Sequence, residues 1–300
     1  MTLTIEAMAG LATIQDAGRP GFRADGVPLC GAMDVASFVL ANALVGNGGA
    51  AAAIEWALAG GSLRFATRTV ASVTGAEVEL SRNGERVPSG TAIEFRADDV
   101  LTVGRFVRGA FAYVAVRGGI DVPAVLGSRS TYLPAGFGGL DGRRLRAGDV
   151  LRCGPAPGSE RSLAVAVEHG ENRGRAIRAI EGPDTTVFTA EFRESFWASE
   201  FTLSPSANRV GYRLERESGR DPESRSVASG PACVGAIQVP GGGGAIVLMA
   251  DGPTVGGYPK IGVVASVDLP TLAQKTPGER VRFERITVDA AQRLLRDENR

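Results

Sequence analysis

The sequence predicts a mainly β protein with a few short helices, divided into two successive domains. Three observations support this prediction: the 300-residue chain contains 41 glycines, its apolar runs are short, and a stretch rich in proline, glycine and charge spans 154–175. We therefore expect a first domain over residues 1–155, a linker over 156–174, and a second domain over 175–300 that includes a C-terminal helix.

The first half predicts seven strands and one helix. Asn83-Gly84 favours a tight hairpin turn. Asp34 is expected to cap a helix that ends at Gly46 and whose apolar face is Val35, Phe38, Val39 and Val45. The expected strands cover residues 3–5, 63–65, 70–74, 77–80, 92–95, 100–103 and 111–116.

The second half follows the same pattern. Helices are expected at 190–199 with Thr189 as cap, at 269–275 with Asp268 as cap, and at 287–300 with an amphipathic pattern. A Gly-acid turn precedes a short strand near the end of each half, which leaves an internal duplication open. The expected strands cover residues 163–167, 176–181, 201–204, 208–214, 236–239, 245–250 and 261–266.

Composition excludes several function classes. Lys plus Arg equals Asp plus Glu at 33 each, so no basic surface for nucleic acid or anionic membrane is expected. A single histidine, His169, argues against a Ser-His-Asp triad, and three scattered cysteines argue against a zinc site, so no metal is expected. No signal peptide or membrane span is visible, and we expect a cytoplasmic protein.

Four groups of residues carry weaker signals for a site. Gln15, Asp16 and Arg19 cluster on a Gly-Pro turn that either grasps a ligand or contains an Asp that caps its own backbone. Residues 27–34 lead into the first helix, and either bind an anion through backbone N–H groups or form a buried loop with a helix cap. The third and fourth groups contain arginines.

Arg129 lies among the hydroxyl residues 128–132, which together suit a carboxylate or a phosphate, although a solvated loop explains them equally. Arg209 and Arg213 fall on one face of an expected strand. That face would bind an anionic substrate or form a ladder of ion pairs.

The strongest signal is the segment 235–260. Two apolar runs flank a Pro-Gly turn, which predicts a β-hairpin, and a glycine-loosened polar loop follows the second run. The four consecutive glycines of the turn lack the Lys-Ser/Thr that completes a phosphate loop. The loop carries Asp251, Gly256, Gly257, Tyr258 and Lys260, and Lys260 is one of only two lysines in the chain.

At these residues the sequence resembles one family. The segments TIQDAGRPG, GVPLCGAMDVASFVLANALVGN, AYVAVRGGIDVPAVLGSRSTY, SANRVGYRLE and GAIQVP…IVLMADGPTVGGYPKI occur in the family's order. The family comprises the second subunit of allophanate hydrolase-like proteins, also called the C subunit of 5-oxoprolinase or the biotin-dependent carboxyltransferase family, and includes antagonists of a sporulation-kinase inhibitor. The resemblance covers residues 3 to 296.

The resemblance implies two tandem cyclophilin-like β-barrel domains, a companion subunit of the allophanate hydrolase subunit 1-like family, and a third subunit. With them the chain is expected to form an ATP-dependent 5-oxoprolinase that opens 5-oxoproline to glutamate. Alternatives are carboxyl transfer from carboxybiotin to a urea-like amide, and a non-catalytic regulator that binds a kinase-inhibitor-like protein. Neither Lys260 nor Lys275 has a biotinylation context, so biotin would arrive on another chain.

Both enzyme chemistries act on an amide-like carbonyl, which requires donors for oxyanion charge and a group that moves a proton. We expect positive charge from Lys260, Arg129 and Arg213, and proton transfer by Tyr258 or Asp251. Gln15 and Gln238 are expected to hold the amide. Gly252 stands where relatives often carry a bulky polar residue, which suggests a site altered for another substrate.

Overall fold

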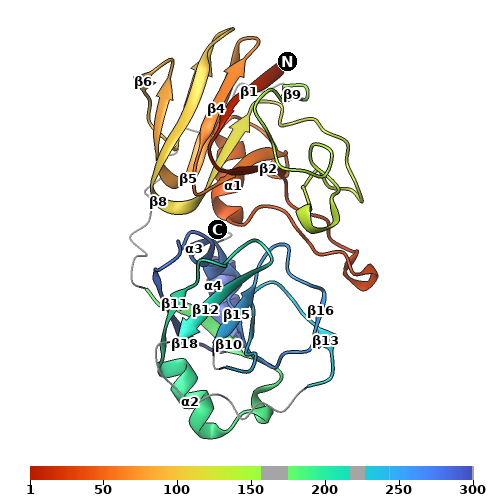
Figure 1. The fold of residues 1–300 in the computed structure, drawn as a ribbon, viewed down its shortest axis with the longest axis vertical. Coiled ribbons are helices and arrows are strands. Elements are labelled where there is room, and N and C mark those ends of the chain that lie inside the picture. The colour runs from red at the N-terminus through yellow and green to blue at the C-terminus, as the bar shows by residue number, and fades with distance from the viewer. Residues whose placement is uncertain (157–174, 217–226, 243, 299–300) are drawn as a thin grey trace. The chain divides into compact units, whose positions relative to one another are not determined.

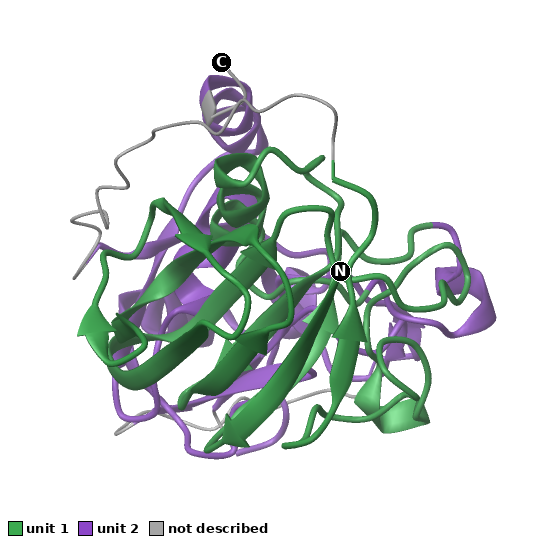
Figure 2. Cartoon of the chain, turned by 90° about the horizontal axis from the view of Figure 1, so that it is seen from above, with its two compact units in different colours: residues 1–20, 30–169 green, residues 21–29, 170–300 purple. Residues whose placement is uncertain are grey.

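The chain forms two compact units. The computed structural model describes residues 1–156, 175–216, 227–242 and 244–298. Unit 1 comprises residues 1–20 and 30–169, and unit 2 comprises residues 21–29 and 170–300 (Figure 2). The expected strand at 163–167, His169, and all but one residue of the expected linker 156–174 lie outside the described residues.

Unit 1 is built on a nine-stranded sheet (Figure 1). The strands follow the order β2-β3-β8-β4-β1-β9, and β5 pairs with β6, β7 and β8. The strands are β1 (Thr2–Met8), β2 (Leu11–Gln15), β3 (Ala53–Ala57), β4 (Gly61–Phe65), β5 (Thr69–Arg82), β6 (Glu85–Arg86), β7 (Ala92–Phe95), β8 (Val100–Val116) and β9 (Val150–Arg152).

Strands β5 and β8 are each continuous where the sequence predicted two short strands. Their antiparallel pairing shifts register between Gly75 and Leu80, so bulges absorb the glycine and charged residues that looked like breaks. Strands β2 and β3 were missed because their residues are buried almost throughout, which removes the alternation that marks a half-exposed strand. The Asn83-Gly84 hairpin is confirmed, with both residues at positive φ between β5 and β6.

Helix α1 (Val35–Leu44) confirms the expected helix and its cap, since the Asp34 carboxylate accepts a hydrogen bond from the backbone N–H of Ser37 at 3.0 Å. The expected apolar face was wrong in part. Val35 and Val39 are exposed, and the buried side chains of the helix are Phe38, Ala41, Asn42 and Leu44. Apolar spacing alone did not identify the face that packs on β5 and β8.

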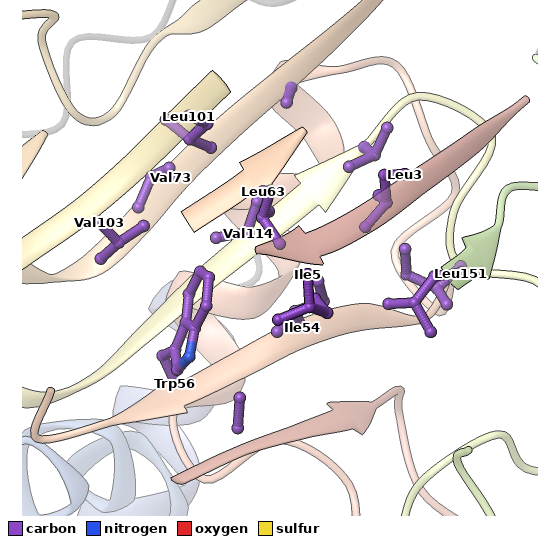
Figure 3. Packing of buried hydrophobic residues seen from close by; sticks show 14 of the residues in the cluster. Leu3, Ile5, Ile54, Trp56, Leu63, Val73, Leu101, Val103, Val114 and Leu151 are labelled. Carbon is purple, nitrogen blue, oxygen red and sulfur yellow. The ribbon is translucent and has the colours of Figure 1, made fainter. Parts of the chain in front are cut away.

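The core of unit 1 lies against this sheet (Figure 3). Leu3 and Ile5 from β1, and Ile54 and Trp56 from β3, are fully buried in it. Side chains of β2, β4, β5, β7, β8 and β9 and of several connecting segments also belong to the cluster. This packing holds the ends of β2 and β3 firmly, and the polar residues of unit 1 follow directly after β2.

Unit 2 contains a closed barrel in the order β10-β17-β14-β15-β12-β11-β18, completed by parallel pairing of β18 with β10. A separate ladder joins β13 (Gly230–Pro231) to β16 (Val255–Gly256). The barrel strands are β10 (Ile177–Glu181), β11 (Glu200–Leu203), β12 (Gly211–Arg216), β14 (Ala236–Gln238), β15 (Ala245–Leu248), β17 (Lys260–Val264) and β18 (Arg280–Arg285). The expected hairpin of residues 236–250 is confirmed as the β14–β15 pair.

Three α-helices accompany the barrel: α2 (Ala190–Ala198), α3 (Leu269–Ala273) and α4 (Val288–Glu298). Thr189 caps α2 by accepting from the N–H of Phe192, as the sequence predicted. Asp268 stands at the N-cap position of α3, as expected, but its side chain makes no capping hydrogen bond. The Asp268 carboxylate instead accepts from the backbone N–H of Arg178 at 2.7 Å and from its guanidinium.

Short 3₁₀ turns complete the chain: η1 (Arg23–Asp25), η2 (Leu133–Ala135), η3 (Thr185–Val187) and η4 (Ser266–Asp268). The mainly β, barrel-type fold class is confirmed, with a half-barrel sheet in unit 1 and a closed barrel in unit 2. In the described part of the chain, no helix combines the length and the hydropathy that a bilayer crossing requires.

Candidate functional site

A buried carboxylate joins two of the sequence-predicted groups of unit 1. Asp16 follows β2, and its Oδ1 accepts from the N–H of Gly18 at 2.8 Å and from the hydroxyls of Ser128 and Ser130 at 2.6 and 2.5 Å. Its Oδ2 accepts from the N–H of Arg129 at 2.5 Å. Four donors therefore meet on one carboxylate, which organises two loops that are more than 100 residues apart in sequence.

Gln15 lies beside this network at the end of β2. Its amide nitrogen donates to Thr13 Oγ1 at 2.9 Å and to the carbonyl of Thr131 at 3.2 Å. Its Oε1 is buried and has no hydrogen-bond partner among the described residues. A buried acceptor without a partner is costly, which distinguishes Gln15 from a residue that only fills space.

Arg19 is completely buried in unit 1. Its Nη2 donates to the carbonyl of Ser130, and its guanidinium carbon lies 4.8 Å from the centroid of the Phe137 ring. Its Nε and Nη1 are buried without a hydrogen-bond partner in the described part of the chain. The structure thus brings Gln15, Asp16 and Arg19 together with the serines of residues 128–130.

Backbone N–H groups of the loop before α1 already donate hydrogen bonds to other residues of the protein. The N–H of Met33 donates to Glu55 Oε2 at 2.9 Å, and the N–H of Asp34 donates to the Tyr113 hydroxyl at 2.8 Å, which in turn donates to Glu55. Burial, followed by the charges of Glu55 and Asp34, holds the pKa of Tyr113 well above its usual value, so Tyr113 stays a neutral donor. Of the two alternatives for residues 27–34, the buried loop with a helix cap is the one observed.

The side chain of Arg129 points to a different partner. Its Nη2 lies 3.0 Å from Asp121 Oδ1, and both side chains are about half exposed. Only the backbone N–H of Arg129 takes part in the Asp16 network. The fork of Arg129 is therefore engaged in a surface ion pair, where it contributes little to stability.

In unit 2, Lys260 and Gln238 lie opposite each other on paired strands β17 and β14. Residues opposite each other in an antiparallel pair share a face of the sheet. The Lys260 ammonium lies 3.0 Å from Asp184 Oδ2, and the backbone N–H of Lys260 donates to the same oxygen at 2.9 Å. Sequence reasoning missed Asp184, because nothing near it in sequence marks a partner 76 residues away.

Gln238 is buried, and its Nε2 has no hydrogen-bond partner among the described residues. A Cβ at Gly256 would lie only 2.6 Å from that nitrogen, so glycine at this position permits the close approach of the amide. The next two residues of the loop are both exposed. Gly257 lies near Ser229, and Tyr258 is half exposed.

Arg209 and Asp251 form a buried, bidentate ion pair, with Nε–Oδ2 and Nη2–Oδ1 distances of 2.9 Å each. The expectation that Arg209 and Arg213 lie on one face of a strand was wrong. Strand β12 begins only at Gly211, and Arg209 is buried while Arg213 is exposed. Of the two alternatives for these arginines, an ion pair is observed for Arg209. Asp251 has both carboxylate oxygens engaged by this partner.

Gly252 stands in a crowded turn. A Cβ there would lie 2.9 Å from the carbonyl oxygen of Met249 and 3.1 Å from that of Val210. A glycine at this position therefore fits the close backbone packing, and a site altered for another substrate stays a prediction. Within the described residues, no group of three His, Cys, Asp or Glu side chains is arranged as metal ligands would be.

Comparisons with known proteins agree with these motifs. The chain is 38% identical over 291 residues to the C subunit of 5-oxoprolinase from Escherichia coli (strain K12), and the match covers 96% of this chain and 92% of that protein. It is 35% identical over 285 residues to the corresponding 5-oxoprolinase protein of Haemophilus influenzae, with 95% and 91% covered.

A solved structure is also similar. The Kluyveromyces lactis urea carboxylase superposes with a TM-score of 0.89 at 31% identity, over 99% of this chain but only 28% of that one. Residues 25–285 match the sequence profile of the carboxyltransferase domain, subdomain A and B. The resemblance found in the sequence motifs is thus confirmed, and the chain belongs to the carboxyltransferase domain (subdomain A and B) family.

Proposed function

We propose that this chain is a subunit of an ATP-dependent 5-oxoprolinase complex that opens 5-oxoproline to glutamate. One observation carries the proposal: the similarity to two proteins named as the C subunit of 5-oxoprolinase extends over more than 90% of both partners. The similarity to urea carboxylase, by contrast, covers 28% of that protein. The identity to the first of these proteins, 38%, also exceeds the 31% identity to urea carboxylase.

The polar group of unit 2 supports this chemistry. Opening a lactam places negative charge on the carbonyl oxygen and requires a proton for the leaving nitrogen. Lys260 supplies a positive charge, and Asp184 holds the ammonium in position at 3.0 Å. Gln238, on the same sheet face, has an amide nitrogen free of partners among the described residues. We assign oxyanion stabilisation to Lys260 and Gln238, and proton transfer to Tyr258.

Asp251 receives a positioning role in this proposal. Its ion pair with Arg209 anchors the start of the loop that carries Gly256, Gly257 and Tyr258. In unit 1, Asp16 positions the segment that carries Gln15 and Arg19.

We assign the use of ATP and of any biotin to the complex with its companion chains. ATP is the co-substrate of the complex, and the partners are a subunit of the allophanate hydrolase subunit 1-like family and a third subunit. Biotin does not fit on this chain, because Lys260 is buried against Asp184 and the side chain of Lys275 is largely buried beside Glu279. A complex that uses cellular ATP belongs in the cytoplasm.

A second candidate is carboxyl transfer to a urea-like amide. The structural match to urea carboxylase over 99% of this chain favours it. In that case a biotin carried by another chain would deliver the carboxyl group. The same lysine and amide groups would then stabilise charge on the acceptor.

The test is glutamate release from 5-oxoproline and ATP by the chain mixed with its two companions, with each omitted in turn. We expect release only in the complete mixture. No release in the complete mixture would contradict the proposal. A parallel assay with urea, bicarbonate and a biotinylated carrier tests the second candidate, and a stable complex that is inactive in both assays would favour a partner-binding regulator.

A further inference from the structure

Arg19 is a buried arginine of unit 1 whose charge has no carboxylate partner among the described residues. The side chain is completely buried, and no carboxylate lies within salt-bridge distance of it among the described residues. Arginine stays protonated in proteins, so burial cannot remove the charge. An unpaired buried charge costs several kcal/mol, which makes an anion the expected partner.

Asp16 is not that partner. Its two carboxylate oxygens accept from Gly18, Ser128, Arg129 and Ser130, and its link to Arg19 runs only through Ser130. The Ser130 hydroxyl donates to Asp16, while the Ser130 carbonyl accepts from Arg19. The two charges therefore share a residue without forming an ion pair in the described part of the chain.

The surroundings fix the orientation of the guanidinium. The Ser130 carbonyl holds Nη2, and the Phe137 ring covers one face at 4.8 Å. Gly138 is buried with φ of 72°, and a Cβ there would lie 3.0 Å from Nη2 and 2.1 Å from the Ser130 carbonyl oxygen. The backbone is thus shaped around the guanidinium, while Nε and Nη1 keep their N–H groups without partners among the described residues.

We propose that Arg19 binds the carboxylate of a small ligand in unit 1, and that 5-oxoproline is this ligand. A guanidinium with a fixed plane and unused N–H groups matches a carboxylate in geometry and charge. The choice of 5-oxoproline rests on the proposed function, since this lactam carries one carboxylate. The requirement for an anion rests only on the contacts of Arg19.

Access to Arg19 requires a local movement. Phe137 covers the guanidinium and is itself only half buried, in a turn where Tyr132 and Phe137 form a bridge. The turn is rich in glycines at positive φ, at residues 136, 138, 139 and 142. Movement of the half-buried Phe137 ring would uncover the guanidinium on that side.

The experiment compares 5-oxoproline with 2-pyrrolidone, the same ring without the carboxylate, on the full chain. Titration calorimetry and thermal melting at constant ionic strength measure binding, with inorganic phosphate as a third probe. We expect 5-oxoproline to bind and to raise Tm. We expect 2-pyrrolidone to bind at least about tenfold more weakly, because the charge-assisted hydrogen bonds are lost.

Arg19→Gln should abolish this discrimination, and Arg19→Lys should weaken 5-oxoproline binding while keeping the charge. Arg105→Gln is the matched control, because Arg105 is an exposed arginine of the same unit paired with Glu79. If Arg19→Gln does not fold, the wild-type comparison of the two lactams and the Arg19→Lys variant still test the site.

Equal binding of the two lactams, equal stabilisation by phosphate, or unchanged binding by Arg19→Gln would overturn the proposal. So would the absence of any binding, which would leave water as the partner of the guanidinium. Binding to the chain without turnover by the complex would support the carboxylate site and contradict the proposed function. Turnover without discrimination against 2-pyrrolidone would do the reverse.

Discussion

Asp16 is the residue on which the polar region of unit 1 depends. It satisfies two backbone N–H groups and two hydroxyls, and its own N–H donates to Ser130 at 2.9 Å. A buried carboxylate that accepts this many hydrogen bonds needs no cation beside it, because each donor stabilises its negative charge. Arg19 depends on it indirectly, since Ser130 contacts both residues.

Asp16→Ala should therefore lower the free energy of unfolding by about 3 kcal/mol or more, because it leaves several buried donors unsatisfied. Urea denaturation measures this loss. The control is Asp121→Ala, which removes an exposed ion pair with Arg129 and should cost less than about 1 kcal/mol. Equal stabilities for the two variants would show that the network does not carry this energy.

Lys260 is the residue to which we assign the main charge of the reaction. Lys260→Ala should abolish glutamate release while leaving complex formation intact, because the side chain lies inside unit 2 beside Asp184. Steady-state kinetics and size-exclusion chromatography of the complex measure the two effects. Lys275→Ala, which alters the chain's other lysine, should retain activity. Activity retained by Lys260→Ala would make the 251–260 loop structural.

At the scale of elements, local sequence determines the hairpin β14–β15, whereas close backbone packing determines the loop that follows it. The turn residues specify the hairpin, and Gly241 in the turn has open space around it, since a Cβ there would meet nothing within 4 Å. The loop after β15 is different, because Gly252 is packed against backbone on two sides. Gly241 therefore lies in open space, whereas Gly252 allows two backbone segments to approach each other closely.

Gly252→Ala should destabilise the protein by about 1–3 kcal/mol, since the added carbon would overlap the Met249 carbonyl. Gly241→Ala is the control and should change stability by no more than about 0.5 kcal/mol. Thermal and urea unfolding report both values. A neutral Gly252→Ala would mean that the turn relaxes, and that a larger residue fits beside Asp251.

On the scale of the whole molecule, two carboxylates make unit 1 sensitive to acid. The Arg143 side chain, at 2.8 and 2.9 Å, lowers the pKa of Asp149. The backbone N–H of Arg96, followed by the Asn83 amide, lowers the pKa of Asp99. A carboxylate with a lowered folded-state pKa contributes stability above its unfolded pKa and loses it as the pH falls through the folded pKa.

We therefore expect stability to fall below about pH 4, where unfolded Asp binds its proton. Asp99→Asn combined with Asp149→Asn should lower stability at pH 7 and flatten its decline between pH 4 and pH 2. Urea denaturation across this range measures the slope. If the free energy of unfolding fell equally with pH in the double variant and the wild type, these two carboxylates would not be the cause of the loss of stability in acid.

How much of the fold the sequence predicted depends on the range of the interactions. The Asn83-Gly84 turn, the Asp34 and Thr189 caps and the β14–β15 hairpin were predicted correctly, because each is determined by neighbouring residues. The buried strands β2 and β3 were missed, and so were the burial of Ala41 and Asn42 on α1 and the exposure of its two valines. These depend on which surfaces meet, which local periodicity does not encode.

The same division applies to the candidate site. The sequence by itself determined the family, the mainly β fold class, and the polar segments around Gln15, Ser128 and Lys260. Only the tertiary structure decided that Asp16 joins two distant loops. The same is true of the ion pairs that Asp184 forms with Lys260 and Asp251 forms with Arg209. The tertiary structure also decided that the buried Arg19 has unused donors. The physical reason is that pairing of buried charges is set by distance in space, and residues 42 to 114 positions apart meet only when the strands have closed.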